Sequence, residues 1–182
     1  MRIIGGTAKG TRLYSVPGLT TRPITDRVKE ALFNILGVAV QGARFLDLFA
    51  GTGSVGIEAL SRGAALAVFV ERDKRAIKTI QRNLRATHLE QKGRLIRRDV
   101  FDYLSDPCDE PFDFIYIAPP QYRGLWTQTL MALDNRDWLA PTGWAIVQIY
   151  PKEYEALNLH ALVLSDQRRY GSTLLCFYTL ST

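Results

Sequence analysis

Apolar residues along this chain of 182 amino acids fall into two kinds of pattern. Short, nearly continuous apolar runs predict buried strands, whereas apolar residues that recur every three or four positions predict helices. The runs lie at residues 44–49, 66–71, 93–98, 112–117 and 144–150, and the helical stretches at 54–62, 73–86, 100–104, 125–133 and 153–157. Because each strand is followed by a helix, the pattern indicates parallel βαβ units, with ligands expected at the carboxyl ends of the strands.

Two further strands are predicted at residues 161–164 and 174–180, with no helix between them. Since parallel neighbours need a long crossover connection, usually helical, we expect an antiparallel hairpin on one edge of the sheet. The chain should therefore form an α/β, Rossmann-like, seven-stranded mixed sheet that ends in this hairpin.

The first 40 residues have a different pattern. Residues 1–21 are rich in Gly, Thr and basic side chains, and strand-like fragments at 2–4 and 12–15 suggest a hairpin-like arm. A helix should begin after Thr25, a good N-cap residue, and end at Gly37. Its apolar stripe is formed by Val28, Ala31, Leu32, Ile35 and Leu36. We therefore divide the chain into a basic N-terminal arm and helix, residues 1–40, and one compact core, residues 41–182.

Composition excludes several classes of protein. The chain is 47% hydrophobic and 23% charged, as expected for one globular domain. It has no apolar run of about 18 residues and no signal-peptide core. Its two cysteines, Cys108 and Cys176, are not in a metal or redox spacing, and its two histidines supply neither a His-rich metal site nor a Ser-His-Asp hydrolase. We expect a cytoplasmic monomer with no metal and no membrane segment.

The net charge of +5 is concentrated near the N-terminus. Residues 1–43 contain six basic and two acidic side chains, a net charge of +4, whereas the remaining chain has a net charge of +1. A basic arm on a nearly neutral body favours an anionic partner, most often a nucleic acid. From charge alone, a solvated surface that only keeps the protein in solution explains the excess equally well.

The most informative segment joins the first predicted strand to its helix, FLDLFAGTGSVG at residues 45–56. Gly51, Gly53 and Gly56 allow a ligand to approach the backbone, and the helix start behind them offers free N–H groups. Glu71 ends the next strand, 20 residues after Gly51, and its carboxylate can accept both hydroxyls of a ribose. A dinucleotide fits this spacing too, but Asp47 would repel a pyrophosphate and suits the ammonium group of a methionine moiety.

Asp99 ends the third predicted strand and extends this pattern. Its carboxylate can accept the exocyclic amine of an adenine while the Val100 N–H binds a ring nitrogen; the alternative is a plain helix N-cap. Asp47, Glu71 and Asp99 then stand near the ends of three successive strands, as a bound adenosyl amino acid requires. No Lys-Ser/Thr pair follows the glycines, which excludes a P-loop.

Several stretches together resemble the RsmD family. They are RIIGG at residues 2–6, KG at 9–10, RPITDRVKEALFNIL at 22–36, DLFAGTG at 47–53 and GIEALSRGA at 56–64. The resemblance covers essentially the whole chain, and the joint occurrence of the 22–36 run and the 47–53 loop is its most specific part.

RsmD proteins are bacterial class I methyltransferases that use S-adenosylmethionine (SAM) to modify guanine N2 in small-subunit ribosomal RNA. The resemblance therefore implies this fold, this cofactor and this substrate. It also implies a set of cofactor contacts at Thr25, Asp47, Ala50, Gly51, Gly53, Glu71, Arg72, Asp99 and Val100.

One motif departs from the family pattern. After the fourth strand the family usually has Asp-Pro-Pro-Tyr/Phe, whereas this chain has Ala118-Pro119-Pro120-Gln121-Tyr122. The acid would accept the N–H of the target amine. Here the Pro119 carbonyl and the Gln121 amide oxygen are the candidate acceptors, and Tyr122 is the candidate stacking partner of a flipped-out base. Losing a charged acceptor costs about 1.5–3 kcal/mol, which slows transfer roughly 10–150-fold.

These residues leave alternatives open. An amino-methyltransferase that acts on another base, such as adenine N6, has the same Pro-Pro loop. A catalytically impaired homologue that still binds SAM and RNA would explain Ala118. A nicotinamide dehydrogenase is the most distant alternative.

Contacts with the phosphates of ribosomal RNA, naked or in a small subunit, are expected from basic residues. The candidates are Lys9, Arg12, Arg22, Arg27 and Arg123, with Tyr14 as a stacking partner and Arg168, Arg169 and Tyr170 as weaker candidates. A further basic stripe is interpreted as a solvated helix face, and it consists of Lys74, Lys78, Arg82 and Arg85. Trp126, Trp138 and Trp144 are interpreted as packing residues.

Overall fold

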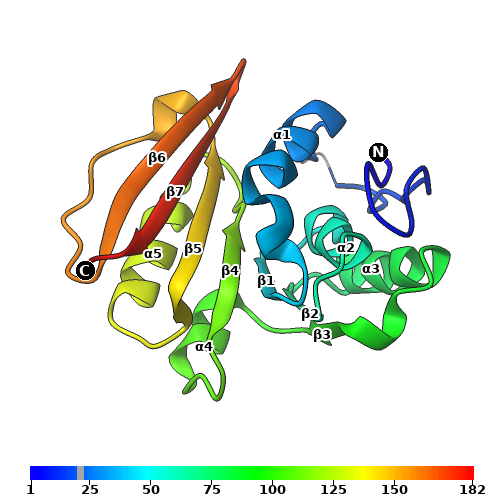
Figure 1. Cartoon of the computed structure of the whole chain (residues 1–182), viewed down its shortest axis with the longest axis horizontal. Helices are drawn as coiled ribbons and strands as arrows, with labels where there is room; N and C mark the ends of the chain where they lie inside the picture. The colour runs from blue at the N-terminus through cyan, green and yellow to red at the C-terminus, as the bar shows by residue number, and fades with distance from the viewer. Residues whose placement is uncertain (20–22) are drawn as a thin grey trace.

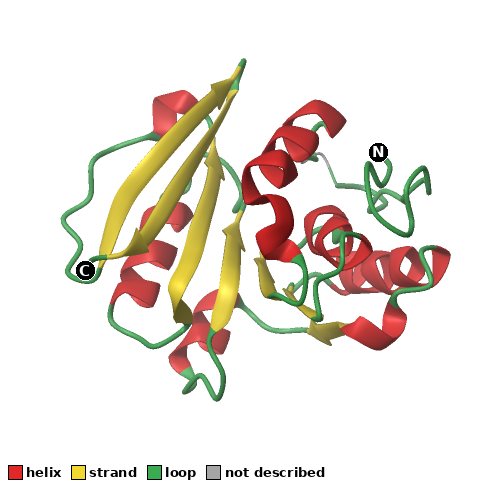
Figure 2. Ribbon diagram, in the orientation of Figure 1, coloured by secondary structure: helices red, strands yellow, loops and turns green. Residues whose placement is uncertain are grey.

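A single seven-stranded sheet runs through the molecule (Figures 1 and 2), in a computed structural model that describes residues 1–19 and 23–182. The strands are β1 (Arg44–Leu48), β2 (Leu66–Val70), β3 (Gly93–Ile96), β4 (Phe112–Ile117), β5 (Leu139–Ile149), β6 (Leu162–Tyr170) and β7 (Thr173–Leu180). The helices are α1 (Asp26–Leu36), α2 (Ser54–Ser61), α3 (Lys74–Ala86), α4 (Val100–Ser105) and α5 (Leu125–Asp134), with 3-10 turns η1 (Gly37–Val40), η2 (Glu90–Lys92) and η3 (Pro151–Glu153).

The order of the strands is β3-β2-β1-β4-β5-β7-β6. Strands β1 to β5 are parallel, whereas β7 pairs antiparallel with both β5 and β6. The chain winds outward from β1 to β3 and then returns to place β4 on the other side of β1. Such a reversal opens a crevice at the carboxyl ends of the central strands. This arrangement confirms the predicted Rossmann-like mixed sheet with its terminal hairpin.

Both faces of the sheet are covered by helices. One core contains Phe45 and Phe69 of the sheet with residues of α1, α2 and α3, and the other contains Leu46 and Ile115 with residues of α4 and α5. Alternate residues of one strand therefore enter different cores. Because both faces are buried, the central strands are apolar at nearly every position, which explains the continuous runs in the sequence.

The N-terminal arm is hairpin-like, as expected, although it forms no regular strand. Residues 1–3 pair antiparallel with residues 10–13 through backbone hydrogen bonds and one isolated bridge between Arg2 and Arg12. The arm is held on α2 and α3 by side chains: Glu58 accepts the N–H groups of Ile4 and Gly5, each at 2.9 Å. It thus packs on the same side of the sheet as α1 (Figure 1).

Some predicted boundaries were wrong. The helix expected at residues 153–157 is only the 3-10 turn η3, because Pro151 starts a short turn that Glu153 closes by accepting the Tyr150 N–H at 3.0 Å. Strand β5 begins at Leu139, where a shift in register with β4 carries pairing past Gly143. Strand β6 continues to Tyr170, since an edge strand tolerates the polar, exposed run 165–169.

Candidate functional site

A cleft of about 920 Å³ lies at the carboxyl ends of the central strands. Its floor is formed by the residues that follow β1, β2 and β4, and its walls by residues 15–19 of the arm, residues 23–28 at the start of α1, and residues 170–173 at the β6–β7 turn. The sheet therefore brings together segments that are more than a hundred residues apart in the chain.

The glycine loop shapes one end of this cleft. Gly53 has a φ of +76° and precedes α2, while the Gly51 N–H donates to a carboxylate oxygen of Glu71 at 2.9 Å. A Cβ at Gly56 would lie 2.4 Å from the Phe69 ring, so only glycine fits there. Ala50 and Gly51 line the cleft, as expected of cofactor contacts. Gly53, for which a cofactor contact was also expected, does not line it; like Gly56, it packs beneath the loop against Phe69.

Asp47 is 2% exposed and lines the cleft from β1. Its Oδ2 accepts the N–H of Gly56 at 3.0 Å, which ties β1 to the first turn of α2. Burial raises the pKa of Asp47 well above its ordinary range; the Gly56 hydrogen bond opposes the rise, and the negative charge of Glu71 adds to it. A cation bound beside Asp47 would favour its ionised form.

Glu71 and Asp99 also lie in the cleft, and both already organise backbone. Glu71 accepts the N–H groups of Gly51 and Asp73, each at 2.9 Å, and Asp99 caps α4 by accepting the Phe101 N–H at 2.8 Å. The N-cap role of Asp99 is thus observed, and it leaves the second carboxylate oxygen 3.8 Å from Arg72. Val100 and Arg72 line the cleft beside these acids.

The residues of the cleft fit SAM. Three carboxylates from three successive strand ends offer acceptors for an ammonium group, ribose hydroxyls and an adenine amine. Between them Phe49 and Phe101 meet edge to face, with 6.5 Å between ring centroids, and both line the cleft. A flat heterocycle can bind against such an apolar surface. The two phenylalanines were not identified from the sequence, where they are ordinary apolar positions.

The Pro-Pro loop follows β4, the strand next to β1 and its glycine loop. Ala118, Pro119, Pro120 and Gln121 all line it, together with Arg123. Tyr122 does not: it has a φ of +58°, is 64% exposed, and stacks on Tyr150 with 5.6 Å between ring centroids. Its N–H donates to Glu153 at 2.7 Å. Glu153 therefore holds both tyrosines, because its other oxygen accepts the N–H of Tyr150.

Two further polar residues of the cleft were missed. Tyr116 on β4 lies beside Asp47 of β1 in the sheet register, and its hydroxyl donates to the side-chain oxygen of Gln148 on β5. Burial raises the pKa of Tyr116 well above its ordinary range, and the charge of Asp47 adds to this. A polar residue near the end of each apolar run, FDFIYI and WAIVQI, was the available signal.

The predicted basic residues fall into different places. Arg27 and Arg123 line the cleft, and Thr25 lines it while capping α1 through the Val28 N–H at 3.3 Å. Lys9 and Arg12 are exposed on the arm outside the cleft. Arg22 lies outside the described residues.

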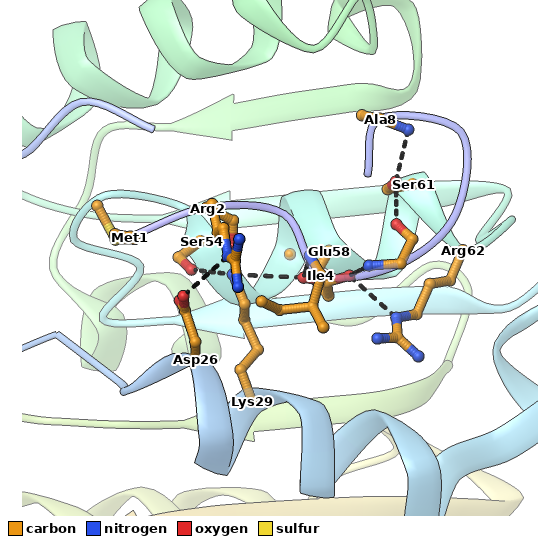
Figure 3. A network of polar contacts seen from close by, with 12 residues as sticks. Met1, Arg2, Ile4, Ala8, Asp26, Lys29, Ser54, Glu58, Ser61 and Arg62 are labelled. Atoms are coloured by element: carbon orange, nitrogen blue, oxygen red, sulfur yellow. Dashed lines mark hydrogen bonds and ion pairs between the residues drawn. The ribbon is translucent and has the colours of Figure 1, made fainter. Parts of the chain in front are cut away.

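Lys29 is part of the N-terminal positive charge, but it is completely buried. Its ammonium lies 3.3 Å from Glu58 and donates to Ser54 Oγ at 2.9 Å and to the Arg2 carbonyl at 2.6 Å (Figure 3). Burial lowers the pKa of Lys29, against the attraction of Glu58. One of the six positive charges counted from the sequence therefore joins the arm to α1 and α2 and does not face a partner.

Two features were searched for among all the described residues, those of the cleft included. No cluster of three or more metal-binding side chains is found in residues 1–19 and 23–182. No helix of that part of the chain combines the length and apolar character needed to cross a membrane.

Comparisons with known proteins agree with this geometry. The family model described as conserved hypothetical protein 95 matches residues 1–179. YlbH of Bacillus subtilis, provisionally named as an rRNA methyltransferase, is 36% identical over 181 residues, 98% of each chain. Ribosomal RNA small subunit methyltransferase D of Escherichia coli (strain K12) is 39% identical over 142 residues, 77% of this chain and 70% of the relative. The solved structure of Escherichia coli yhhF has a TM-score of 0.88 at 32% identity, covering 99% of this chain and 97% of that one.

Proposed function

Because this chain belongs to the family described as conserved hypothetical protein 95, we propose that it is a SAM-dependent methyltransferase that modifies guanine N2 of small-subunit ribosomal RNA. The observation that supports this most is the meeting of three strand-end carboxylates and a Pro-Pro loop in one cleft. The names of the relatives from Bacillus subtilis and Escherichia coli support the substrate class. Since ribosomal RNA is the substrate, we place the protein in the cytoplasm, and we expect a monomer that needs no metal.

The carboxylates divide the binding of the cofactor. Asp47, buried beside the glycine loop, faces the ammonium group and gains its counter-charge on binding. Glu71 accepts the ribose hydroxyls from the end of β2, and Asp99 accepts the adenine amine with the Val100 N–H beside it. When bound, SAM supplies an electrophilic methyl group on a sulfonium, so the chain mainly has to position the acceptor.

The Pro-Pro loop positions that acceptor. The amine of guanine is a weak nucleophile because its lone pair is conjugated with the ring. The Pro119 carbonyl and the Gln121 amide oxygen accept its N–H groups and disperse the positive charge that develops as the nitrogen–carbon bond forms and the carbon–sulfur bond breaks. The amine then releases one proton to restore neutrality. Tyr122 lies outside the cleft, stacked on Tyr150 at the rim, and it reaches the extruded base only if this loop shifts.

Ala118 favours one rival function. Without an acid at this position, an impaired homologue would bind SAM and RNA and transfer methyl slowly or not at all. A target other than guanine, such as adenine N6, would use the same loop.

Transfer of labelled methyl tests the proposal. The full chain is incubated with methyl-labelled SAM and small subunits from cells that lack the corresponding modification. Label is expected in the RNA, and Gly56→Val, whose side chain would clash with Phe69 under the cofactor loop, should lose it together with cofactor binding. Absence of label from the RNA, with binding of S-adenosylhomocysteine intact, would contradict the enzyme activity and leave the impaired homologue.

A further inference from the structure

The exposed face of α3 carries positive charge only. The helix Lys74–Ala86 has five basic side chains, all exposed, and no acidic one: Lys74, Arg75, Lys78, Arg82 and Arg85. Four of them recur every three or four residues and form one stripe, whereas Ala76, Ile80, Asn83 and Leu84 of the same helix are buried. Like charges at this spacing destabilise a helix, and a face that is merely solvated usually alternates in sign. The α3 stripe (Lys74, Lys78, Arg82 and Arg85) therefore needs another explanation.

The arm runs directly along this stripe. Tyr14 pairs with Asn83 of α3 in both directions: its N–H donates to Oδ1 at 2.7 Å, and its carbonyl accepts Nδ2 at 3.1 Å. The Arg82 guanidinium lies 3.4 Å from the centroid of the Tyr14 ring. Arg75 donates to the Pro17 carbonyl at 3.3 Å. Residues 14–17 of the arm therefore pack against α3, and Tyr14 touches the α3 stripe at Arg82.

This surface continues to the cleft. Ser15, Val16 and Leu19 of the arm line the cleft, and so does Asp73, the N-cap of α3. The stripe starts at the rim with Lys74 and extends along the helix for about 16 Å to Arg85, at 1.5 Å per residue. Figure 1 shows α3 beside α2, with the arm next to both helices.

The opposite side of the sheet carries mixed charge: the exposed Arg94, Arg98 and Arg136 lie there among acidic residues, and Arg98 pairs with Asp106. Exposed acidic residues cluster on α4 and the loops near it, at Asp102, Asp106, Asp109, Glu110 and Asp137. A polyanion that approaches the cleft therefore meets only positive charge on the exposed face of α3, and mixed charge on the α4 side.

We propose that the α3 stripe binds the phosphate backbone of the RNA next to the target nucleotide, as a second contact outside the cleft. The proposal rests on the proposed function, because it assumes that RNA enters the cleft. Contacts of this kind position a nucleic acid without reading its sequence. The stripe holds the flanking strand while the arm, between stripe and cleft, guides the target base toward the Pro-Pro loop.

The test removes charge from the stripe and spares its structural contact. Lys78→Ala with Arg85→Ala removes two charges and leaves Arg82 on Tyr14. The matched control, Arg94→Ala with Arg136→Ala, removes two exposed charges on the α4 side, where Arg94 lies near Tyr103 and Arg136 donates to the Ser105 carbonyl. Affinity for a naked transcript of small-subunit ribosomal RNA is measured over a range of salt concentrations.

The stripe variant should bind the transcript more weakly, and the slope of log affinity against log salt should fall by about one per side chain, so by about two. The control should keep the wild-type slope, and both should bind S-adenosylhomocysteine as the wild type does. A wild-type slope in the stripe variant, or an equal fall in the control, overturns the proposal. If the wild type binds the transcript but methylates no RNA, the proposed function fails separately.

Discussion

Asp47 combines burial with charge. It is almost completely buried, and its Oδ2 accepts the N–H of Gly56. Its pKa is raised, mainly by burial. In the proposed complex the ammonium group of SAM would place a positive charge beside this carboxylate, whereas the pyrophosphate of a dinucleotide would be repelled by it.

Replacing the charge of Asp47 tests this role. Asp47→Asn keeps an oxygen for the Gly56 N–H, so the loop should remain intact. We expect S-adenosylhomocysteine to bind about 10–150-fold more weakly, the value of one charged hydrogen bond. Isothermal titration calorimetry measures this, and Asp113→Asn, at the far end of β4, is the control.

Asp47→Asn should weaken cofactor binding but make the folded chain more stable at higher pH. The pKa of Asp47 is higher in the folded chain than the ordinary 3.8, so the wild type loses stability as the pH rises from 3.8 through the raised value. Asp47→Asn lacks this loss. The difference in free energy of unfolding, variant minus wild type, should therefore increase with pH. Urea denaturation at several pH values measures it. A difference that decreases with pH would contradict this assignment.

Ala118 stands where the family resemblance leads us to expect an acid. If Pro119 and Gln121 are the remaining acceptors, Ala118→Asp should restore a charged acceptor and raise the single-turnover rate about 10-fold or more. Gln121→Ala should lower the rate of the wild type and have less effect in Ala118→Asp. An unchanged or lower rate in Ala118→Asp would mean that the neutral acceptors already suffice.

The sequence predicted which acids would meet in one cleft, and their roles as cofactor contacts stay predictions. Asp47, Glu71 and Asp99 stand at strand ends, and the topology alone brings strand ends together. Tyr116 and Gln148 were missed because their meeting depends on the register of β4 and β5, which the sequence does not specify. Lys29 was counted as surface charge because it lies beside the apolar stripe of α1. Nothing in that stripe reveals that Glu58, far away in the sequence, is its buried partner.

At the scale of elements, the buried network of Lys29, Glu58 and Arg62 joins the arm, α1 and α2 (Figure 3). Glu58→Leu leaves Lys29 buried without its counter-charge, and we expect a loss of about 3–5 kcal/mol in the free energy of unfolding. The double variant with Lys29→Met should lose less than Glu58→Leu alone, since the buried ammonium of Lys29 is removed and the charge that stays without Glu58, on Arg62, is partly exposed. Chemical denaturation of the three chains checks this; an additive result would show that the pair is not coupled.

The Pro-Pro loop depends on another element, the 3-10 turn η3. Glu153 accepts the N–H groups of Tyr122 and Tyr150 and so fixes the stacked pair at the rim. Glu153→Ala should lower the rate of methyl transfer roughly 10-fold or more, because the Pro-Pro loop loses its anchor. Cofactor affinity should stay the same, because the variant leaves the contacts of Asp47, Glu71 and Asp99 unchanged. Glu155→Ala, an exposed neighbour, is the control. A loss of cofactor affinity instead would assign Glu153 to the overall fold.

The elements themselves were largely predictable. The helical stripe from Val28 to Leu36, with Thr25 as its cap, and the five βα units follow from local periodicity, which buried faces impose directly. The turn η3 and the full length of β6 could not be predicted, since a turn that starts at a proline and a polar edge strand have no apolar pattern.

The whole molecule is polarised by charge and by topology. The cleft opens at the switch point of the sheet, the arm and the α3 stripe lie on its basic side, and acidic residues gather around α4. Because Lys29 is buried, it does not add to the surface charge of the N-terminal segment. If the α3 stripe binds RNA as proposed, the strand approaches the cleft over α3 and the arm.

Identification of the methylated nucleoside tests the central claim most directly. Small-subunit RNA that lacks the modification is incubated with the full chain and methyl-labelled SAM, digested to nucleosides and separated by chromatography with mass detection. The label is predicted in N2-methylguanosine, at one position of the RNA. Label in N6-methyladenosine, or none in the RNA although the protein binds it, would contradict the account.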